Sequence, residues 1–186
     1  ASRLDPVVAQ LHELGLATKA YLYGFDEVEV DDFDKMERVF AFLKARYPEL
    51  RLATTARDPG LGVDQKLGKL VDIWVPLSAA YETDPAAQAR LGGAEVWWYI
   101  CISPQHPYAN WFVEYPALEA RLLWWMAHQR GIEGFLYYAM NRWPEQRAPL
   151  NADSFGRTSW NPASYGTANG DGSLFYAGVD GPISSI

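Results

Sequence analysis

Five short apolar segments alternate with helix-like stretches along this chain, and that alternation limits the fold more than any other feature of the sequence. The apolar segments span residues 20–25, 51–55, 71–76, 96–102 and 134–140. Their apolar residues run together instead of alternating with polar ones, which is typical of strands that are buried on both faces. Such strands joined by helices indicate a parallel sheet covered on both sides. We therefore predict an α/β fold, with one further strand at 174–177.

Helix signals fill the intervals between these strands. In one interval Phe33, Met36 and Phe40 recur at the spacing of a helix face. The predicted helices begin at Asp5, at Asp31 or Asp32, at Asp84 and at Pro116, and they end at Gly15, Pro48, Gly92 and Gly131, with a short helix near 64–69. We expect the aspartates at the first two helix starts to act as N-caps. Trp124 and Trp125 fall in the middle of the last helix and are expected to be packing residues.

Two adjacent carboxylates, Asp26 and Glu27, come directly after the first apolar strand. Neighbouring acids inside a buried strand would carry a large desolvation cost, so we place the pair at the end of the strand. The carboxyl ends of parallel strands are where α/β folds keep their chemistry. Acid pairs in such positions often only cap a helix or lie in solvent, but Asp31 or Asp32 already provides a cap. We expect the pair to share a solvent-shielded hollow.

Composition narrows the classes of ligand. The net charge is −7 and no basic stripe is present, which argues against a nucleic-acid partner. No apolar run reaches the roughly 18–20 residues that cross a bilayer, so no membrane partner is expected. The three histidines lack the spacing of metal ligands, and we expect neither a metal nor another cofactor. An acidic chain with 15% aromatic residues fits a neutral ligand such as a carbohydrate.

Residues 141–173 show neither helical nor strand periodicity and are rich in Asn, Pro, Gly and Ser. Loops of this length in compact domains are usually functional or disordered. Because the segment also contains aromatic residues such as Trp143, we expect an ordered loop that lies over the site. Asn169–Gly172 predicts a tight turn into the final strand.

Several of these segments together resemble the catalytic barrel of glycoside hydrolase family 123. The resemblance is carried by Tyr21–Glu27 (YLYGFDE), Trp97–Cys101 followed by Pro104, Glu119–Trp125, Gly134–Tyr138 with Asn141 and Trp143, and Gly170–Gly172 before Leu174–Tyr176. It runs from about Tyr21 to Ile186 and implies a (β/α)8 barrel of the TIM type. In such a barrel the strands at 20, 51, 71, 96 and 134 would be the fourth to the eighth. The chain, as a single unit over 1–186, would then supply only the C-terminal part.

The resemblance also implies an activity, the removal of a terminal β-linked N-acetylhexosamine, with N-acetylgalactosamine as the expected sugar. The 2-acetamido group of the substrate would take part in a retaining reaction, an exception to the two-carboxylate scheme. By matching positions, Glu27 would be the acid/base and Asp26 would orient the acetamido group. The residues expected to bind the substrate are Tyr99, Tyr138, Asn141, Trp143 and His106. Since two close carboxylates do not both ionise cheaply, we expect Glu27 to carry the proton.

Two alternatives stay open. In a conventional two-carboxylate glycosidase, Glu27 would work with a distant acid such as Glu114. In a non-catalytic carbohydrate-binding or assembly subunit, another polypeptide or dimerisation would complete the barrel and cover its strand edges. For the barrel in general, the partner we expect is another chain or the missing N-terminal segment. The resemblance further implies a secreted or periplasmic location.

Overall fold

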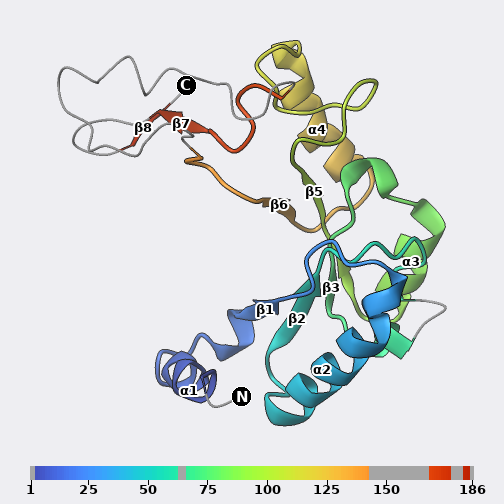
Figure 1. Cartoon of the computed structure of the whole chain (residues 1–186), viewed down its shortest axis with the longest axis vertical. Coiled ribbons are helices and arrows are strands. Elements are labelled where there is room, and N and C mark those ends of the chain that lie inside the picture. Colours follow the sequence, from blue (N-terminus) through green and yellow to red (C-terminus); the bar gives the residue numbers. More distant parts are fainter. Residues whose placement is uncertain (1–2, 63–65, 143–167, 177–181, 185–186) are drawn as a thin grey trace. The chain divides into compact units, whose positions relative to one another are not determined.

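The computed structural model describes residues 3–62, 66–142, 168–176 and 182–184 (Figure 1). The chain divides into two compact units, the first comprising Ala1–Trp98 and Ile132–Phe135 and the second comprising Tyr99–Gly131 and Leu136–Ile186. The boundary crosses the chain within strands β5 (Trp98–Ile100) and β6 (Phe135–Tyr137), which pair with each other.

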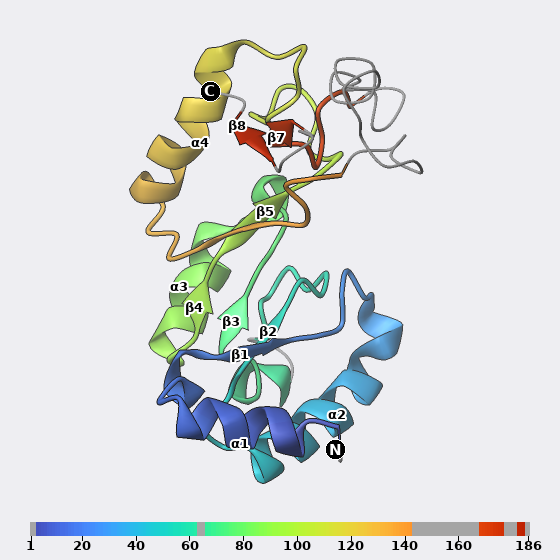
Figure 2. The same cartoon turned by 90° about the vertical axis from the view of Figure 1, so that its left-hand side faces the viewer.

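In the described part of the first unit, four strands form a parallel sheet whose order follows the chain (Figure 2). They are β1 (Tyr21–Tyr23), β2 (Arg51–Thr54), β3 (Ile73–Trp74) and β4 (Glu95–Val96). In the register of this sheet Leu22 lies opposite Leu52, and Trp74 lies opposite Val96. The predicted α/β fold with parallel strands is therefore confirmed.

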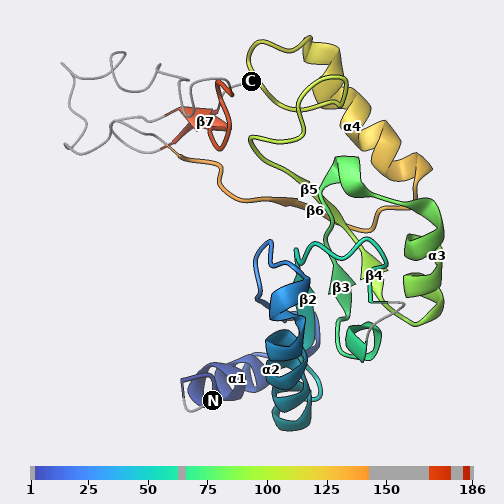
Figure 3. The same ribbon diagram turned by 45° about the vertical axis from the view of Figure 1, so that its right-hand side comes forward.

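Helices accompany this sheet and cover its core. They are α1 (Asp5–Glu13), α2 (Phe33–Arg46) and α3 (Thr83–Leu91), with short 3-10 helices at Ala17–Lys19, Val30–Asp32, Lys66–Lys69 and Ser78–Ala80. Helix α2 buries Phe33, Met36 and Phe40, the residues whose spacing predicted it. Helix α3 lies beside β4 (Figure 3). Leu52 and Ile73 on the strands are at most 1% exposed, and each such side chain stabilises the fold by about 1.5–3 kcal/mol.

The two predicted N-caps are wrong. Helix α1 begins at Asp5 itself, and the Asp5 carboxylate accepts hydrogen bonds from Tyr47 Oη at 2.6 Å and Arg46 Nη2 at 3.0 Å. Asp32 occupies the N-cap position of α2 but makes no side-chain cap hydrogen bond. Its φ of −93° and ψ of −4° are helical, because a 3-10 turn leads directly into α2. An N-cap side chain reaches back to the helix from an extended backbone, which Asp32 does not have.

The predicted strand 96–102 is divided between two partners. Its first part pairs with β3 in β4, and its second part pairs with β6 in β5. The change falls at Trp97, whose N–H donates to the carbonyl of Trp74 at 2.8 Å, whereas the next N–H, of Trp98, donates to Gly134 at 3.3 Å. A Cβ atom on Gly134 would lie 2.3 Å from Cδ2 of Trp97, so this close approach requires glycine.

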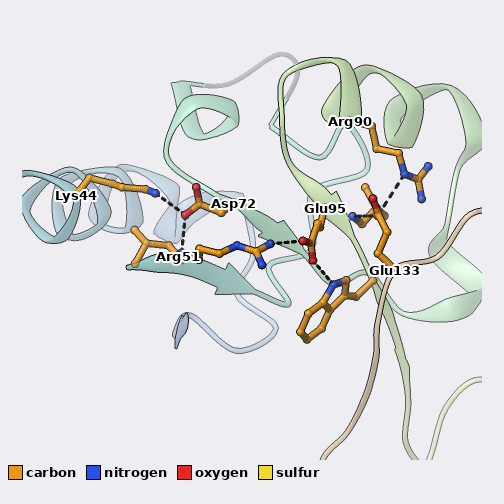
Figure 4. A network of polar contacts seen from close by, with 9 residues as sticks. Lys44, Arg51, Asp72, Arg90, Glu95 and Glu133 are labelled. Carbon is orange, nitrogen blue, oxygen red and sulfur yellow. Dashed lines mark hydrogen bonds and ion pairs between the residues drawn. The ribbon is translucent and has the colours of Figure 1, made fainter. Parts of the chain in front are cut away.

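Carboxylates tie the amino-terminal ends of the strands together (Figure 4). Asp72 accepts from Lys44 Nζ at 2.5 Å and from the Leu52 N–H at 2.6 Å. Glu95 accepts from Arg51 Nη2 at 2.8 Å and from Trp97 Nε1 at 2.9 Å. Glu133 accepts from the Val96 N–H at 2.7 Å and from Arg90 Nε at 3.4 Å. In barrel-like α/β folds this end of the strands serves stability, and the opposite end carries the chemistry.

The second unit contains helix α4 (Ala117–Gln129) and the antiparallel pair β7 (Phe175–Tyr176) and β8 (Ile183–Ser184). The expectation that Trp124 and Trp125 pack inside is wrong, because they are 50% and 62% exposed. The buried stripe of α4 runs through Leu123 and Ala127, one turn apart, and the adjacent tryptophans point away from it.

Most of the predicted loop 141–173 lies outside the described residues, but its two ends are described and they meet. Asn141 forms an antiparallel bridge with Ser173, and the Arg142 N–H donates to the Gly172 carbonyl at 2.8 Å. Residues 169–172 form a turn, as predicted.

Candidate active site

The acid pair lies immediately beyond β1, at the carboxyl end of the parallel sheet. The Gly24 N–H still continues the sheet by donating to the Ala53 carbonyl at 3.0 Å. Of the non-glycine residues that the structure describes, three have a positive φ, and two of these, Phe25 (58°) and Glu27 (49°), flank Asp26. A left-handed backbone costs such residues about 1–2 kcal/mol each. Because strain of this kind concentrates at functional sites, the backbone is a second, independent reason to regard the pair as a candidate site.

Two buried threonines at the end of β2 hold this strained turn. Thr54 Oγ1 donates to the Phe25 carbonyl at 2.9 Å, and Thr55 Oγ1 accepts from the Glu27 N–H, also at 2.9 Å. The two threonines are 0% and 2% exposed. Because β1 and β2 are parallel, their carboxyl ends lie at the same edge of the sheet. The threonines at the end of β2 can therefore form hydrogen bonds with the backbone of the loop that follows β1. Neither threonine is among the site residues predicted from the sequence, and the available signal was their place at the end of the predicted strand 51–55.

The Asp26 carboxylate is held by two hydroxyl groups, which we call the hydroxyl clamp, from Tyr23 and Thr55. Asp26 Oδ1 accepts from Thr55 Oγ1 at 2.8 Å and from Tyr23 Oη in a short hydrogen bond, and the two hydroxyl oxygens are 2.9 Å apart. Burial of the Tyr23 hydroxyl, and then its bond to Asp26, raise the pKa of Tyr23 well above its ordinary value. Tyr23 therefore stays protonated and remains a donor to Asp26.

The Glu27 carboxylate has a different partner. Glu27 Oε2 lies 3.0 Å from Arg57 Nη2, and the other terminal nitrogen of Arg57 lies 2.9 Å from Glu29 Oε1. Hydrogen bonds to Glu29 and Glu27 raise the pKa of Arg57 further above its ordinary value, so its charge is permanent. Arg57 is thus a cation shared by two carboxylates.

The first unit alone does not provide the solvent-shielded hollow that we expected around the pair. Asp26 is exposed and Glu27 is partly exposed. The reason lies in the order of the described strands, in which β1 is at an edge of the sheet and the loop after β1 extends beyond that edge.

The other predicted site residues belong to the second unit, which carries Tyr99, His106, Tyr138 and Asn141, while Trp143 lies outside the described residues. Tyr99 is on β5 and is 6% exposed. His106 follows β5 and stacks on Tyr115 with ring centroids 3.8 Å apart. Tyr138 and Asn141 come just after β6, and both are exposed. Within this unit, Tyr138 and Asn141 therefore lie in one short segment after β6. Tyr99 lies on β5, and His106 lies in the segment that follows β5.

A buried carboxylate, Asp171, organises the segment after β6. It is 0% exposed and accepts from Tyr138 Oη at 2.7 Å and Tyr137 Oη at 3.1 Å, while the Gly172 N–H donates to Tyr137 Oη at 2.7 Å. Burial raises the pKa of Asp171, although the bonds from both tyrosines and the charge of Arg142 oppose that rise. Burial likewise raises the pKa of Tyr138 to about 12. A Cβ on Gly172 would lie 2.6 Å from Tyr138 Oη, so the turn must present glycine there.

Sequence reasoning missed Asp171 and the aromatic group beside it. The centroid of the Trp111 ring lies 4.8 Å from the centroid of the Tyr137 ring, in an edge-to-face contact, and 5.9 Å from the centroid of the Trp124 ring. The available signal for Asp171 was an acid between two glycines, a segment that predicts a turn and contributes to the family resemblance but does not identify Asp171 as a site residue. Among the described residues, no group of three or more His, Cys, Asp and Glu could hold a metal ion, and no helix is long and apolar enough to cross a membrane.

Comparison with known proteins adds to this geometry. The family model described as glycoside hydrolase 123, catalytic domain, matches residues 2–186. No curated protein matches the chain. Among solved structures, a family 123 glycoside hydrolase from Clostridium perfringens, studied for the details of glycolipid glycan hydrolysis, is similar with a TM-score of 0.67 and 19% sequence identity. The match covers 95% of this chain and 29% of that one, so this chain spans less than a third of the length of that structure.

Proposed function

The chain belongs to glycoside hydrolase family 123 through its catalytic domain, and on that premise we propose that it carries the acid pair of a retaining glycosidase that releases a terminal β-linked N-acetylhexosamine. The observation that carries the proposal is the strained Asp26–Glu27 turn at the carboxyl end of β1, held from the neighbouring strand. The study of glycolipid glycan hydrolysis in the Clostridium perfringens relative supports a glycan substrate, and N-acetylgalactosamine is the sugar we propose.

In the proposed reaction the acetamido oxygen of the substrate forms a bond to the anomeric carbon, and the bond from that carbon to the leaving oxygen breaks. Glu27 gives its proton to the leaving oxygen and then takes one from the water that opens the oxazoline. Asp26 accepts the acetamido N–H and stabilises the positive charge that develops on the new ring. The hydroxyl clamp supports this role for Asp26, because two donors bind one oxygen of the carboxylate, Oδ1, and fix the position of the group.

In the proposed reaction Glu27 is protonated at one step and charged at another, and the contacts of Arg57 are compatible with both states. While Glu27 is charged, Arg57 bridges Glu27 and Glu29. When Glu27 is protonated, Glu29 still provides Arg57 with a carboxylate. The cation therefore does not have to move for Glu27 to act as an acid.

We further propose that β1, β2, β3, the β4–β5 segment and β6 are the fourth to eighth strands of a (β/α)8 barrel. The parallel order of β1 to β4 and the acid pair at their carboxyl end support this arrangement. The substrate-binding residues would be Tyr99, Tyr138, Asn141, Trp143 and His106, with a polypeptide segment or chain outside these 186 residues completing the barrel.

One observation favours a second candidate, the conventional two-carboxylate glycosidase. Glu27 Oε2 lies 3.0 Å from Arg57 Nη2, and a carboxylate bound to a guanidinium group suits a nucleophile better than an acid. An acid such as Glu114, which is exposed and accepts a hydrogen bond from Asn169, would then protonate the leaving group.

The test uses the full-length protein and chromogenic β-N-acetylgalactosaminide, β-N-acetylglucosaminide and β-galactoside. We expect turnover of an acetamido sugar, none of the galactoside, and strong inhibition by a thiazoline analogue of the acetamido sugar. Glu27→Gln should lower kcat/KM by about 10²–10⁴-fold, the usual contribution of an acid/base group, and Glu13→Gln, on an exposed glutamate of α1, is the matched control. An equally active Glu27→Gln variant would contradict the proposal, and indifference to the thiazoline would favour the second candidate.

A further inference from the structure

We propose that Thr54 and Thr55 are positioning residues that fix Asp26 so that the protein binds one carboxylate oxygen, Oδ1, and presents the other, Oδ2, to the acetamido N–H of the substrate. The role of Oδ2 toward substrate rests on the proposed function. The holding of Asp26 by the threonines does not, since it rests on contacts within the first unit alone.

The hydrogen-bonding capacity of Thr55 accounts for the orientation of Asp26. A threonine hydroxyl has one proton to donate and can accept two hydrogen bonds. Thr55 gives that proton to Asp26 Oδ1 at 2.8 Å and accepts the Glu27 N–H at 2.9 Å. A single buried hydroxyl thus connects the side chain of one acid to the backbone of the next.

Tyr23 directs a second proton to the same oxygen. Its hydroxyl donates to Asp26 Oδ1, and it lies 2.9 Å from Thr55 Oγ1. Since each hydroxyl has one proton and both protons go to Oδ1, this oxygen carries two donors. Among the described residues, no hydrogen bond reaches Oδ2 of Asp26. The two oxygens of one carboxylate therefore have different roles.

Thr54 fixes the backbone on the other side of Asp26. Its hydroxyl donates to the Phe25 carbonyl at 2.9 Å and accepts the Ala56 N–H at 3.1 Å. Phe25 and Glu27, the left-handed residues on either side of Asp26, are thus each bound by one of two consecutive threonines. Because both threonines are almost completely buried, water does not replace these bonds when a hydroxyl is removed.

The experiment combines crystal structures and kinetics of the full-length wild type and the variants Thr55→Val, Thr55→Ser and Thr54→Val. Valine keeps the branched shape without the hydroxyl, and serine keeps the hydroxyl without the methyl group. Thr18→Val, on an exposed threonine of the 3-10 helix Ala17–Lys19, is the control. We expect the Asp26 carboxylate to rotate in Thr55→Val and to keep its place in Thr55→Ser and Thr18→Val.

The kinetic expectation separates positioning from general stability. In Thr55→Val, kcat should fall on the order of 100-fold while KM changes little, because a displacement of about 1 Å is enough for such a loss. Thr55→Ser should restore most of kcat, and Thr54→Val should lower kcat with a smaller displacement of Asp26. Equal kinetics for the valine and serine variants, or an unmoved Asp26 in Thr55→Val, would overturn the inference.

Two further results remain informative. If the wild type turns over no acetamido sugar, the proposed function fails, while the position of Asp26 in the variant crystals still decides the positioning role. If Thr55→Val does not fold, Tyr23→Phe replaces it, because the exposed Tyr23 ring loses only one of the two donors to Oδ1. A rotated Asp26 in Tyr23→Phe supports the clamp, and an unchanged Asp26 contradicts it.

Discussion

The guanidinium group of Arg57 lies 3.0 Å from the carboxylate of Glu27 and reaches it from the segment that follows β2. The same segment donates its backbone N–H, at Arg57, to the Val28 carbonyl at 2.9 Å. The loop after β1 and the loop after β2 are therefore joined at both the backbone and the side-chain level.

Arg57→Ala is expected to affect catalysis more than stability. The Arg57 side chain is 56% exposed, and ion pairs at the surface usually contribute about 0–1 kcal/mol. The free energy of unfolding in urea should therefore change by less than about 1 kcal/mol. We expect kcat/KM to fall, because Glu27 loses the partner that orients it. Arg38→Ala, on an exposed arginine of α2, is the control, and unchanged kinetics in Arg57→Ala would show that Arg57 does not orient Glu27.

Gly134→Ala is expected to destabilise the first unit. The new Cβ would overlap the Trp97 indole ring at 2.3 Å, and overpacking of this kind typically costs about 1–3 kcal/mol. Gly24→Ala is the matched substitution, because its Cβ would lie at an ordinary 3.7 Å from Cε1 of Phe40. Thermal and urea unfolding of both variants provide the test. Equal stability of the two would mean that Trp97 has room to move.

Tyr137→Phe is expected to cost more stability than Tyr138→Phe. Loss of the Tyr137 hydroxyl removes a donor to the buried Asp171 and the acceptor of the buried Gly172 N–H. An unsatisfied buried polar group costs about 1–3 kcal/mol. Tyr138→Phe also removes a donor to Asp171, but it leaves the acceptor of the Gly172 N–H in place, and the Tyr138 side chain is 44% exposed. Urea unfolding of the two variants should rank them in this order, and the reverse order would contradict the network as described.

Asp171 should make stability depend on pH. Burial raises its folded pKa above the ordinary value of 3.8, so the folded state binds more protons than the unfolded state between 3.8 and the raised value. Stability from this group is therefore greatest below that window and falls as pH rises through it. Asp171→Asn removes this dependence. The stability difference between wild type and Asp171→Asn, measured in urea from about pH 4 upward, should shrink as pH rises, and a growing difference would contradict the prediction.

Residue patterns in the sequence predicted those helices and strands that depend on residues close together in the chain. The spacing of Phe33, Met36 and Phe40 is a property of one helix, and α2 buries all three. The capping prediction failed at Asp32 because a side chain's partners depend on the backbone of the preceding turn, which is helical there. The division of the strand at Trp97 could not be predicted either, since it depends on which neighbours the two halves meet.

The sequence by itself determined that an α/β sheet forms and that Asp26 and Glu27 stand where its first strand ends. Only the tertiary structure decided what holds them. The parallel register that sets Tyr23 opposite Ala53 carries Thr54 and Thr55 to the same edge of the sheet as the acid pair. Hydrogen bonds form between groups that packing brings within about 3 Å. Residues some thirty positions apart along the chain come that close only through the pairing of the strands between them.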